Sequence, residues 1–259
     1  MTYKVEKINP YETEESKKEQ VTRMFDQIAP KYDALNGLLS LGIDNYWRRE
    51  SVLALKPYAP QTILDVATGT GDFAILSEKL LKPKRIVGID VSEGMMNVGR
   101  DKVRKRGLQN IITFDKQDCS SLSFGDNTFD AVTASFGVRN FEDIDKSFQE
   151  VLRVLKPGGV FLFIELTTPE TSPMKDLYAL YTKHIMPRLS NTMATEQRAY
   201  EYLPESIAAF PQGREMMLIL KKNGFTNIRL RRLTLGITTM YIAEAPSDSQ
   251  KEKETKLKK

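Results

Sequence analysis

The stretch Leu64-Asp65-Val66-Ala67-Thr68-Gly69-Thr70-Gly71-Asp72 decides the fold of this 259-residue chain. The apolar residues up to Val66 are typical of the end of a buried strand, and apolar residues at helical spacing follow from Phe73 onward. The turn between them is built mainly from small residues, so a ligand can approach its backbone closely. The stretch therefore predicts a strand, a ligand-binding turn and a helix, the opening unit of an α/β domain.

Two carboxylates at this turn, Asp65 and Asp72, separate two classes of ligand. A dinucleotide fingerprint, Gly-x-Gly-x-x-Gly, places a pyrophosphate at the helix N-terminus. This chain matches it only as Gly69-x-Gly71-x-x-Ala74, and the carboxylate of Asp72 would repel a pyrophosphate. S-adenosylmethionine carries a sulfonium and an ammonium group and no phosphate, so the turn favours this cofactor over NAD. Two alternatives to this interpretation are a dehydrogenase that binds NAD at the turn and a glycine-rich turn that packs in the protein without binding a ligand.

The composition is that of an ordinary soluble domain, with 41% hydrophobic residues, 28% charged residues and a net charge of +4. The single cysteine, Cys119, excludes an internal disulfide. The N-terminus lacks the apolar core of a signal peptide, and the longest apolar run, 160–166, is too short to span a bilayer. We predict a cytosolic protein without a nucleic-acid partner, and peripheral contact with a membrane stays open.

From residue 62 onward, short apolar strands alternate with longer amphipathic segments, a pattern typical of a parallel sheet. The predicted strands are 62–66, 85–90, 111–115, 129–134 and 160–166, and the predicted helices are 72–81, 94–106, 144–155 and 213–223. The last strands, 228–235 and 238–243, are too close for a parallel crossover and must form an antiparallel hairpin. We therefore predict an α/β fold: one Rossmann-like domain whose mostly parallel, seven-stranded sheet ends in an antiparallel hairpin.

Segments on either side of this alternation predict additions to the domain. Residues 1–60 are expected to form an N-terminal extension, loosely held to about residue 17, and cap helices. One cap helix should end at Pro30, and another should begin with Asp44 as its N-cap. Residues 61–245 form the predicted catalytic domain, in which 167–212 is a helical lid insertion, and 246–259 is a predicted disordered tail.

Further candidate site residues follow the second, third and fourth predicted strands. Asp90 ends the second strand about twenty residues beyond the glycine turn, where a carboxylate can accept hydrogen bonds from both ribose hydroxyls of an adenosine cofactor or NAD. Its alternative role is an N-cap of the next helix. Asp118 follows the third strand and could accept a hydrogen bond from an adenine amino group. Arg139 and Asn140 follow the fourth strand, at the sheet edge where α/β proteins place their substrates.

Motifs along the chain resemble those of a known family. The turn at 65–72, Gly88-Ile89-Asp90-Val91-Ser92, Asp118, Phe129-Asp130 and Leu155-Lys156-Pro157-Gly158-Gly159 together resemble class I S-adenosylmethionine-dependent methyltransferases. Narrower motifs are similar to the menaquinone/ubiquinone biosynthesis C-methyltransferase family. They are Met24-Phe25-Asp26-Gln27-Ile28-Ala29-Pro30-Lys31-Tyr32-Asp33, Trp47-Arg48-Arg49, Ala134-Ser135-Phe136-Gly137-Val138-Arg139-Asn140 and Tyr202-Leu203-Pro204-Glu205-Ser206-Ile207. The resemblance covers about residues 20–245.

The resemblance implies S-adenosylmethionine as the cofactor and no metal. It implies cofactor contacts at Thr70, Asp90, Asp118 with Cys119, and Ser135, to which we add the turn residues Asp65, Gly69 and Gly71. Many relatives have Asn-Ala in place of Asp118-Cys119, but an aspartate can still accept a hydrogen bond from the adenine amino group. The implied substrate is a quinol with a polyprenyl tail. We expect the lid and the cap helices to form a channel for that tail, and core packing is the alternative role of their apolar side chains.

The run 65–69 resembles the menaquinone-only members of the family more closely, so the expected reaction is methylation of demethylmenaquinol in menaquinone biosynthesis. The equivalent step of ubiquinone biosynthesis and methylation of another small aromatic molecule are alternatives. A scaffold that binds the cofactor without turnover also stays open. The quinol must lose a hydroxyl proton for its ring carbon to become a good nucleophile, which requires positioned polar groups.

We hypothesise that Arg139 and Asn140 orient the quinol hydroxyl, or a water molecule that accepts its proton. The alternative for Arg139 is a surface ion pair. The only histidine, His184, is a rival base. It lies on an apolar stripe at helical spacing, where a lone histidine is more often a packing residue.

Overall fold

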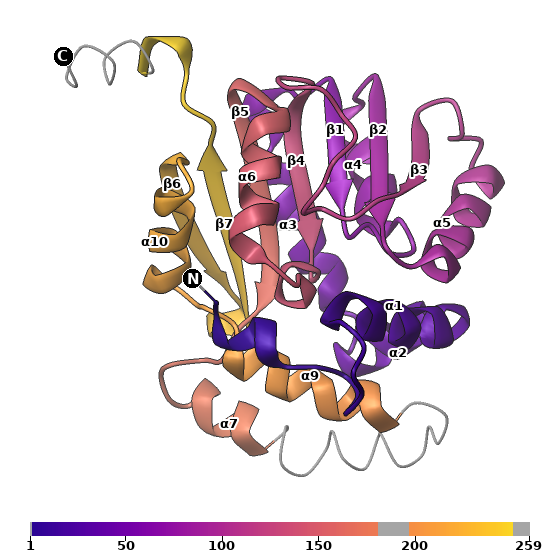
Figure 1. Ribbon diagram of the computed structural model, residues 1–259, viewed down its shortest axis with the longest axis vertical. Coiled ribbons are helices and arrows are strands. Elements are labelled where there is room, and N and C mark those ends of the chain that lie inside the picture. Colours follow the sequence, from indigo (N-terminus) through magenta and orange to yellow (C-terminus); the bar gives the residue numbers. More distant parts are fainter. Residues whose placement is uncertain (1, 181–196, 251–259) are drawn as a thin grey trace.

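The computed structural model describes residues 2–180 and 197–250 and is organised around a seven-stranded sheet (Figure 1). The strands are β1 Thr62–Val66, β2 Arg85–Asp90, β3 Ile112–Lys116, β4 Phe129–Ser135, β5 Leu155–Leu166, β6 Thr226–Leu233 and β7 Thr238–Glu244. They lie in the order β3-β2-β1-β4-β5-β7-β6, and β7 is antiparallel to both of its neighbours. The predicted α/β fold and the closing hairpin are therefore confirmed, with strand ends shifted by a few residues.

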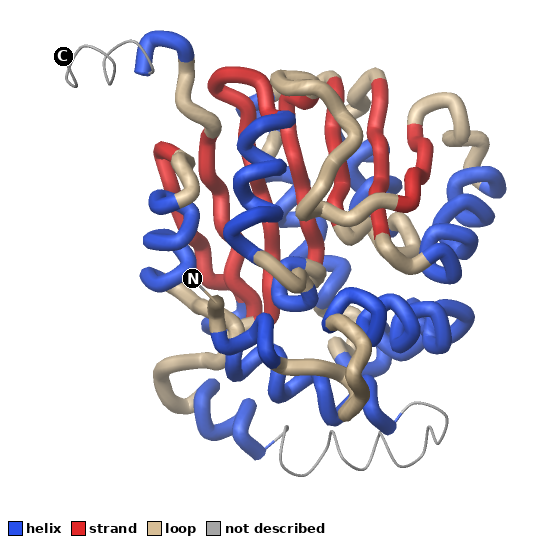
Figure 2. Tube along the Cα trace, viewed as in Figure 1, coloured by secondary structure: helices blue, strands red, loops and turns tan. Residues whose placement is uncertain are grey.

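Helices cover both faces of this sheet (Figure 2). The described helices are α1 Lys17–Ile28, α2 Tyr32–Leu39, α3 Asp44–Ala54, α4 Asp72–Leu81, α5 Glu93–Lys105, α6 Ile144–Val154, α7 Met174–Leu180, α9 Gln197–Ala209 and α10 Arg214–Lys222. Apolar side chains of α3, α4 and α5 form one core with one face of the sheet, and those of α6 and α10 form a second core with the other face. The central strands are apolar on both sides because both sides are covered.

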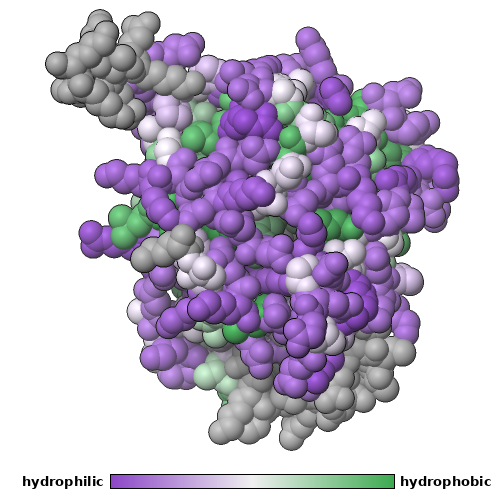
Figure 3. Space-filling view, in the orientation of Figure 1, coloured by the Kyte–Doolittle hydropathy of each residue, from purple (hydrophilic) through white to green (hydrophobic). Residues whose placement is uncertain are grey.

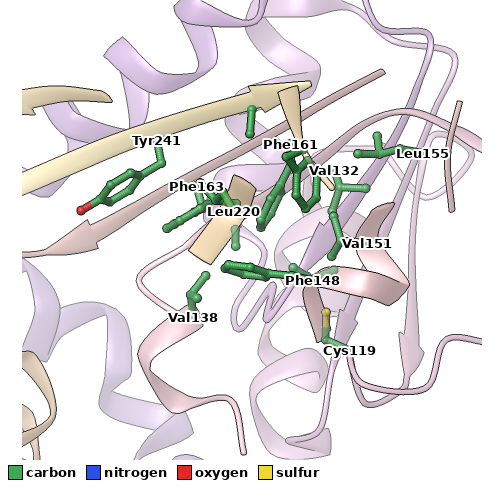
Figure 4. Packing of buried hydrophobic residues seen from close by; sticks show 14 of the residues in the cluster. Cys119, Val132, Val138, Phe148, Val151, Leu155, Phe161, Phe163, Leu220 and Tyr241 are labelled. Atoms are coloured by element: carbon green, nitrogen blue, oxygen red, sulfur yellow. The ribbon is translucent and has the colours of Figure 1, made fainter. Parts of the chain in front are cut away.

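Aromatic rings lock α6 and the antiparallel end of the sheet together (Figure 4). The ring of Phe148 on α6 lies 5.4 Å from that of Phe161 and 5.9 Å from that of Phe163, measured between ring centroids. Phe163 in turn stacks on Tyr241 of β7 at 4.8 Å. Such pairs contribute beyond their buried area. They hold β5 firmly, which matters because the far end of β5 contributes to the candidate site.

The N-terminal helices α1 and α2 lie with α9 beyond the edge where the parallel strands end (Figure 1). Val21 and Met24 of α1 pack against Tyr202 of α9, so segments far apart in sequence form one cap. Helix α2 was not predicted: Leu35 is its one buried residue, and a helix this short depends on tertiary contacts.

The expectation that the first seventeen residues are loosely held is wrong. A short 3-10 helix, Lys4–Lys7, buries Val5 completely in the core beneath α6. Oε1 of Glu6 accepts a hydrogen bond of 2.8 Å from the backbone N–H of Ile144 at the start of α6. The start of the chain is therefore tied to the domain by both apolar and polar contacts.

Two local predictions also need correction. Asp44 is the first residue of α3 and not its N-cap, which is Ile43. The residues at 156–159 were expected to precede the fifth strand, but β5 already begins at Leu155, which pairs with Phe129. The next pair is Ala131 with Val160, so residues 156–159 form a bulge inside the strand.

The face of the molecule seen in Figure 3 is covered mainly by hydrophilic side chains. Within the part of the chain that the structure describes, no helix combines the length and apolar character that crossing a bilayer requires. His184 and most of the predicted C-terminal tail lie outside the described residues. The predicted division into domain, lid and tail stays a prediction.

Candidate active site

The glycine turn after β1 adopts a conformation that favours small residues. Ala67, Gly69 and Gly71 all have positive φ, at 51°, 56° and 77°. The backbone N–H of Gly69 donates a 2.8 Å hydrogen bond to Oδ2 of Asp90, at the end of the neighbouring strand β2. Because parallel strands end at one edge, the turn and this carboxylate meet there as the sequence predicted.

Asp90 is held by the backbone on both of its oxygens. Oδ2 accepts from Gly69, and Oδ1 accepts a 2.9 Å bond from the N–H of Ser92. Burial raises the pKa of Asp90, although these N–H donors oppose the rise. The N-cap of α5 is Ser92, whose Oγ accepts from the N–H of Met95, so the alternative capping role for Asp90 is wrong. The free lone pairs of Asp90 can accept hydroxyl groups of a ligand.

A cleft of about 720 Å³, lined by both polar and apolar residues and open to solvent, runs along this edge. Its lining includes the predicted site residues Gly69, Asp90, Asp118, Cys119, Ser135 and Asn140. We call it the first cleft. The pKa of Asp118 lies below its usual range: burial opposes the shift, but the Ser120 N–H and an ion pair of 3.2 Å with Lys18 outweigh it.

Cys119 contributes to the first cleft differently from its neighbours. Its Sγ lies 3.9 Å from the carbonyl oxygen of Ser147, so the side chain points toward α6 and the core, as Figure 4 shows. Burial raises the pKa of this thiol well above its usual range. The cysteine is therefore an unreactive, buried residue at the border of the cleft.

Three predicted cofactor residues do not line the first cleft. Asp65 is buried beneath the turn, and its oxygens accept hydrogen bonds of 2.7 Å from the hydroxyls of Thr68 and Thr133. Burial raises its pKa to about 6. Thr70 donates to Asp33 of α2 at 2.7 Å, and a Cβ at Gly71 would come within 2.8 Å of the ring of Phe114. In this structure these residues shape and support the turn.

The turn after β4 brings two backbones unusually close. Phe136 has a positive φ of 61°, and a Cβ placed on Gly137 would lie 2.4 Å from the Cβ of Ala67. Only glycine permits this contact between the turns that follow β1 and β4. Phe136 in this turn and Tyr32 of α2 border both the first cleft and a second cleft.

The second cleft is mostly apolar and has a volume of about 740 Å³. It lies between the sheet edge and the cap, and its lining comes from α2, α3, α7, α9 and the ends of β4 and β5. Its wall is formed by Tyr32, Asn36, Leu39, Ser40, Asp44, Trp47, Arg48, Phe136, Arg139, Leu166, Tyr178, Leu203, Ile207 and Ile237. A flat ring with an apolar chain fits such a cavity, with a few polar groups to orient it.

Arg139 is buried, and the alternative of a surface ion pair is wrong. The residue is 6% exposed, and its side chain pairs at 2.9 Å with Oε2 of Glu165, which is fully buried at the end of β5. Oε1 of Glu165 also accepts the backbone N–H of Arg139 at 3.1 Å. Sequence reasoning missed Glu165, although it is the one charged residue in the apolar run 160–166.

Asn140 and Arg139 serve different clefts. Asn140 borders the first cleft, and its Oδ1 accepts a 3.0 Å hydrogen bond from the hydroxyl of Tyr202. Arg139 borders the second cleft. The two residues therefore flank the junction at Phe136, as their neighbouring positions after β4 predicted. His184, the rival base, lies outside the described residues.

Lys17 is a buried ammonium that sequence reasoning also missed. It lies at the start of α1, where its Nζ donates to the carbonyl oxygens of Val5 at 2.5 Å and Arg139 at 3.1 Å. Burial lowers the pKa of Lys17 to about 7, with the nearby Arg139 acting in the same direction and Glu6 and Glu142 opposing. The side chain connects the N-terminal segment to the turn that carries Arg139.

This lowered pKa predicts how stability depends on pH. Between about pH 7 and the ordinary lysine value of 10.5, the unfolded chain holds a proton on Lys17 that the folded chain has released. The free energy of unfolding therefore gains a contribution that rises with pH across this interval. The free energy of unfolding is measured by urea unfolding across this pH interval for Lys17→Met and for the native protein. The rise should be present in the native protein and absent in Lys17→Met. Lys18→Met is the control, because Asp118 raises the pKa of Lys18; an identical change in both variants would contradict the assignment.

The fold places the chain in a known class of proteins. A solved S-adenosylmethionine-dependent methyltransferase from Thermotoga maritima, a possible histamine N-methyltransferase, aligns with a TM-score of 0.61 and 18% identity. The alignment covers 86% of this chain and 99% of that chain. At this identity the likeness shows the fold alone, which is the Rossmann-like methyltransferase fold.

The sequence profile of the ubiE/COQ5 methyltransferase family matches residues 13–244, and the chain belongs to this family. A demethylmenaquinone methyltransferase from Bacteroides fragilis is 54% identical, over 94% of this chain and 99% of its own length. A ubiquinone/menaquinone biosynthesis C-methyltransferase UbiE from Geobacter sulfurreducens is 41% identical, over 92% and 93%. The chain is therefore a methyltransferase; the resemblance inferred from the motifs is confirmed, and the dehydrogenase alternative is wrong.

Proposed function

We propose that this enzyme transfers a methyl group from S-adenosylmethionine to a ring carbon of demethylmenaquinol, forming menaquinol. The observation that carries the proposal is the pair of clefts that meet at Phe136, one with acidic residues in its wall and the other mostly apolar. A charged cofactor and an apolar quinol can thus approach each other from opposite sides of one residue. The 54% identity to a demethylmenaquinone methyltransferase supports the naphthoquinol as the substrate.

The first cleft fits the chemistry of S-adenosylmethionine. Its acidic lining residues are Asp90, Asp118 and Glu142, and Lys18 is neutralised by its ion pair with Asp118. This balance suits a ligand with a sulfonium and an ammonium group. In addition, the buried Oγ of Ser135 has no hydrogen-bond partner in the described part of the protein, and Ser135 borders the cleft. A bound ligand would satisfy that hydroxyl.

Asp90 would accept hydrogen bonds from the ribose hydroxyls, and Asp118 would accept one from the adenine amino group. Gly69 borders the first cleft and has no side chain, so the ligand can lie against the backbone of the turn. Asp65, Thr70 and Gly71 act one step away by holding this turn, and not as contacts. When bound, the cofactor supplies an electrophilic methyl group.

The chain's own groups must hold the quinol and its developing negative charge. Burial alone would lower the pKa of Arg139, but the carboxylate of Glu165 keeps it above the ordinary arginine value. Arg139 is thus a permanent cation and no base, and its buried Nε has no hydrogen-bond partner among the described residues. We assign it to the quinol oxygen next to the reacting carbon, where it stabilises the quinolate in a site largely shielded from water.

A further polar group, Asn140, is needed because the quinol must lose a proton and Arg139 cannot accept it. Asn140, fixed by the hydroxyl of Tyr202, borders the first cleft, where we expect it to hold a water molecule that takes the quinol proton.

The polyprenyl tail would leave the second cleft past Leu39 and Tyr178, next to the exposed side chains of Leu38 and Leu177. Each CH₂ group moved there from water contributes about 0.8 kcal/mol.

A methyl-transfer assay tests the proposal directly. The purified enzyme is supplied with S-adenosylmethionine and either demethylmenaquinol or the demethylated benzoquinol precursor of ubiquinone, and products are identified by mass spectrometry. We expect faster conversion of the naphthoquinol. Preferred conversion of the benzoquinol would favour the ubiquinone alternative, and no conversion of either quinol would reject the proposal. In a deletion strain, demethylmenaquinone should accumulate in lipid extracts.

A further inference from the structure

An ion pair lies in the wall of the apolar second cleft, apart from the Arg139–Glu165 pair. Asp44 and Arg48 are one turn apart on α3, and each is 7% exposed. Nη1 of Arg48 donates to Oδ2 of Asp44, while Oδ1 of Asp44 accepts a 2.6 Å hydrogen bond from Ser40. Ser40, Asp44 and Arg48 all border the second cleft.

Stability alone is a poor reason for such a pair. Two charges lose their hydration when buried, and a well-packed apolar pair at such positions is often equally stable or more so. The surroundings are apolar, since Trp47 and Phe136 pack edge-to-face beside the pair with ring centroids 6.0 Å apart. An ion pair maintained in an apolar cavity is explained if its remaining donors bind a polar atom of the ligand.

Arg48 has donors left for that purpose. Among the residues that the structure describes, Asp44 is its one hydrogen-bond partner, so most of its five N–H groups are free. The guanidinium carbon lies 5.5 Å from the ring centre of Phe136, which borders both clefts. Asp44 and the aromatic face thus hold the planar group in one orientation at the cleft wall.

Both arginines of the second cleft contact the same residue. Nη1 of Arg139 donates to the backbone carbonyl of Phe136 at 2.5 Å, whereas Arg48 lies over its ring. A quinol likewise carries two oxygens, on opposite sides of its ring, and only one of them is next to the methylated carbon. A single anchor would let the ring turn about that oxygen, whereas two anchors hold its plane and its direction.

We propose that Arg48, oriented by Asp44, binds the second ring oxygen of the quinol, the one para to the oxygen held by Arg139. Arg48 is then a specificity-determining residue that favours a ring with two hydroxyls and holds its unsubstituted carbon toward the methyl group. This inference rests on the proposed function. It distinguishes Arg48 from its neighbour Arg49, whose side chain is 58% exposed and lies within 3.6 Å of Glu50.

The test compares two substrates in two variants. One substrate is the quinol, and the other is the matched 1-naphthol, which keeps the prenyl group and the hydroxyl next to the reacting carbon but lacks the second hydroxyl. For the quinol, Arg48→Lys should lower kcat/KM by roughly 10- to 150-fold, the effect of losing a hydrogen bond to a charged group. For the naphthol, which never makes this bond, the variant and the native enzyme should differ little.

Arg49→Lys is the matched control and should leave both substrates unaffected. An equal loss on both substrates in Arg48→Lys would show a structural role and overturn the inference, as would no loss on either. If Arg48→Lys does not fold, Asp44→Asn carries the same comparison and should show the same substrate-selective loss. No methylation of the quinol by the native enzyme would instead overturn the proposed function, and this inference with it.

Discussion

Glu165→Gln is expected to lower the free energy of unfolding by about 3–5 kcal/mol, because it leaves the buried Arg139 without its counter-charge. Glu165 is fully buried, and its two oxygens accept both the guanidinium and the backbone N–H of Arg139. The glutamine amide has one NH₂ group in place of an acceptor oxygen. It would therefore either face a donor of Arg139 with that NH₂ group or lose one of these hydrogen bonds. Urea unfolding at neutral pH measures the loss, and a change below about 1 kcal/mol would mean that water already solvates the pair.

An apolar replacement of the whole pair separates stability from catalysis. Arg139→Leu combined with Glu165→Leu removes both charges, so most of the stability lost in Glu165→Gln should return. Turnover should not return, because no cation then faces the quinol oxygen. Methyl transfer by this double variant at the native rate would contradict the catalytic role proposed for Arg139.

Asp90→Ala is expected to weaken S-adenosylmethionine binding by roughly 1.5–3 kcal/mol for each charged hydrogen bond to the ribose that is lost. With two hydroxyls in contact, the expected loss of affinity exceeds a hundredfold. The substitution also releases the N–H of Gly69, which loosens the turn that borders the cofactor. Isothermal titration with S-adenosylmethionine measures the effect.

Asp26→Ala is the control for an indirect effect through α5. Oδ1 of Asp26 accepts the hydroxyl of Ser92 at 2.6 Å and the N–H of Gly94 at 2.8 Å, at the same end of α5. Asp26 does not border the first cleft. Its loss should therefore affect stability more than affinity. If both variants weakened binding equally, Asp90 would act by holding the helix and not by touching the cofactor.

Much of the fold could be predicted because it is encoded locally. Alternation of apolar strands and amphipathic helices located the strands and the principal helices of the domain, and the short spacing of the last strands required the hairpin. Helix α2 was missed because its stability comes from α1 and α9, not from its own pattern. The anchored N-terminus was missed for the same reason, since Val5 is buried by residues more than a hundred positions away.

The candidate site, like the fold, could be predicted from the sequence only in part. Gly69, Asp90, Asp118 and Asn140 could be placed on one edge from sequence, because parallel strands bring their carboxyl ends together. Glu165 also ends a strand, but nothing local says that its partner is Arg139. The buried positions of Lys17 and Arg48 were equally invisible, because each depends on which distant segment covers it.

The sequence by itself predicted a Rossmann-like fold with its candidate site at the carboxyl edge of the sheet, because the alternation of strands and helices and the chemistry of the turns are local. The resemblance of its motifs to a known family added the methyltransferase activity. The tertiary structure decided which charges are paired and where the two clefts meet. That meeting point depends on the contact between Gly137 and Ala67, 70 residues apart, where a Cβ on the glycine would lie only 2.4 Å away. Contacts of this kind arise from packing between elements, which spacing along the chain does not record.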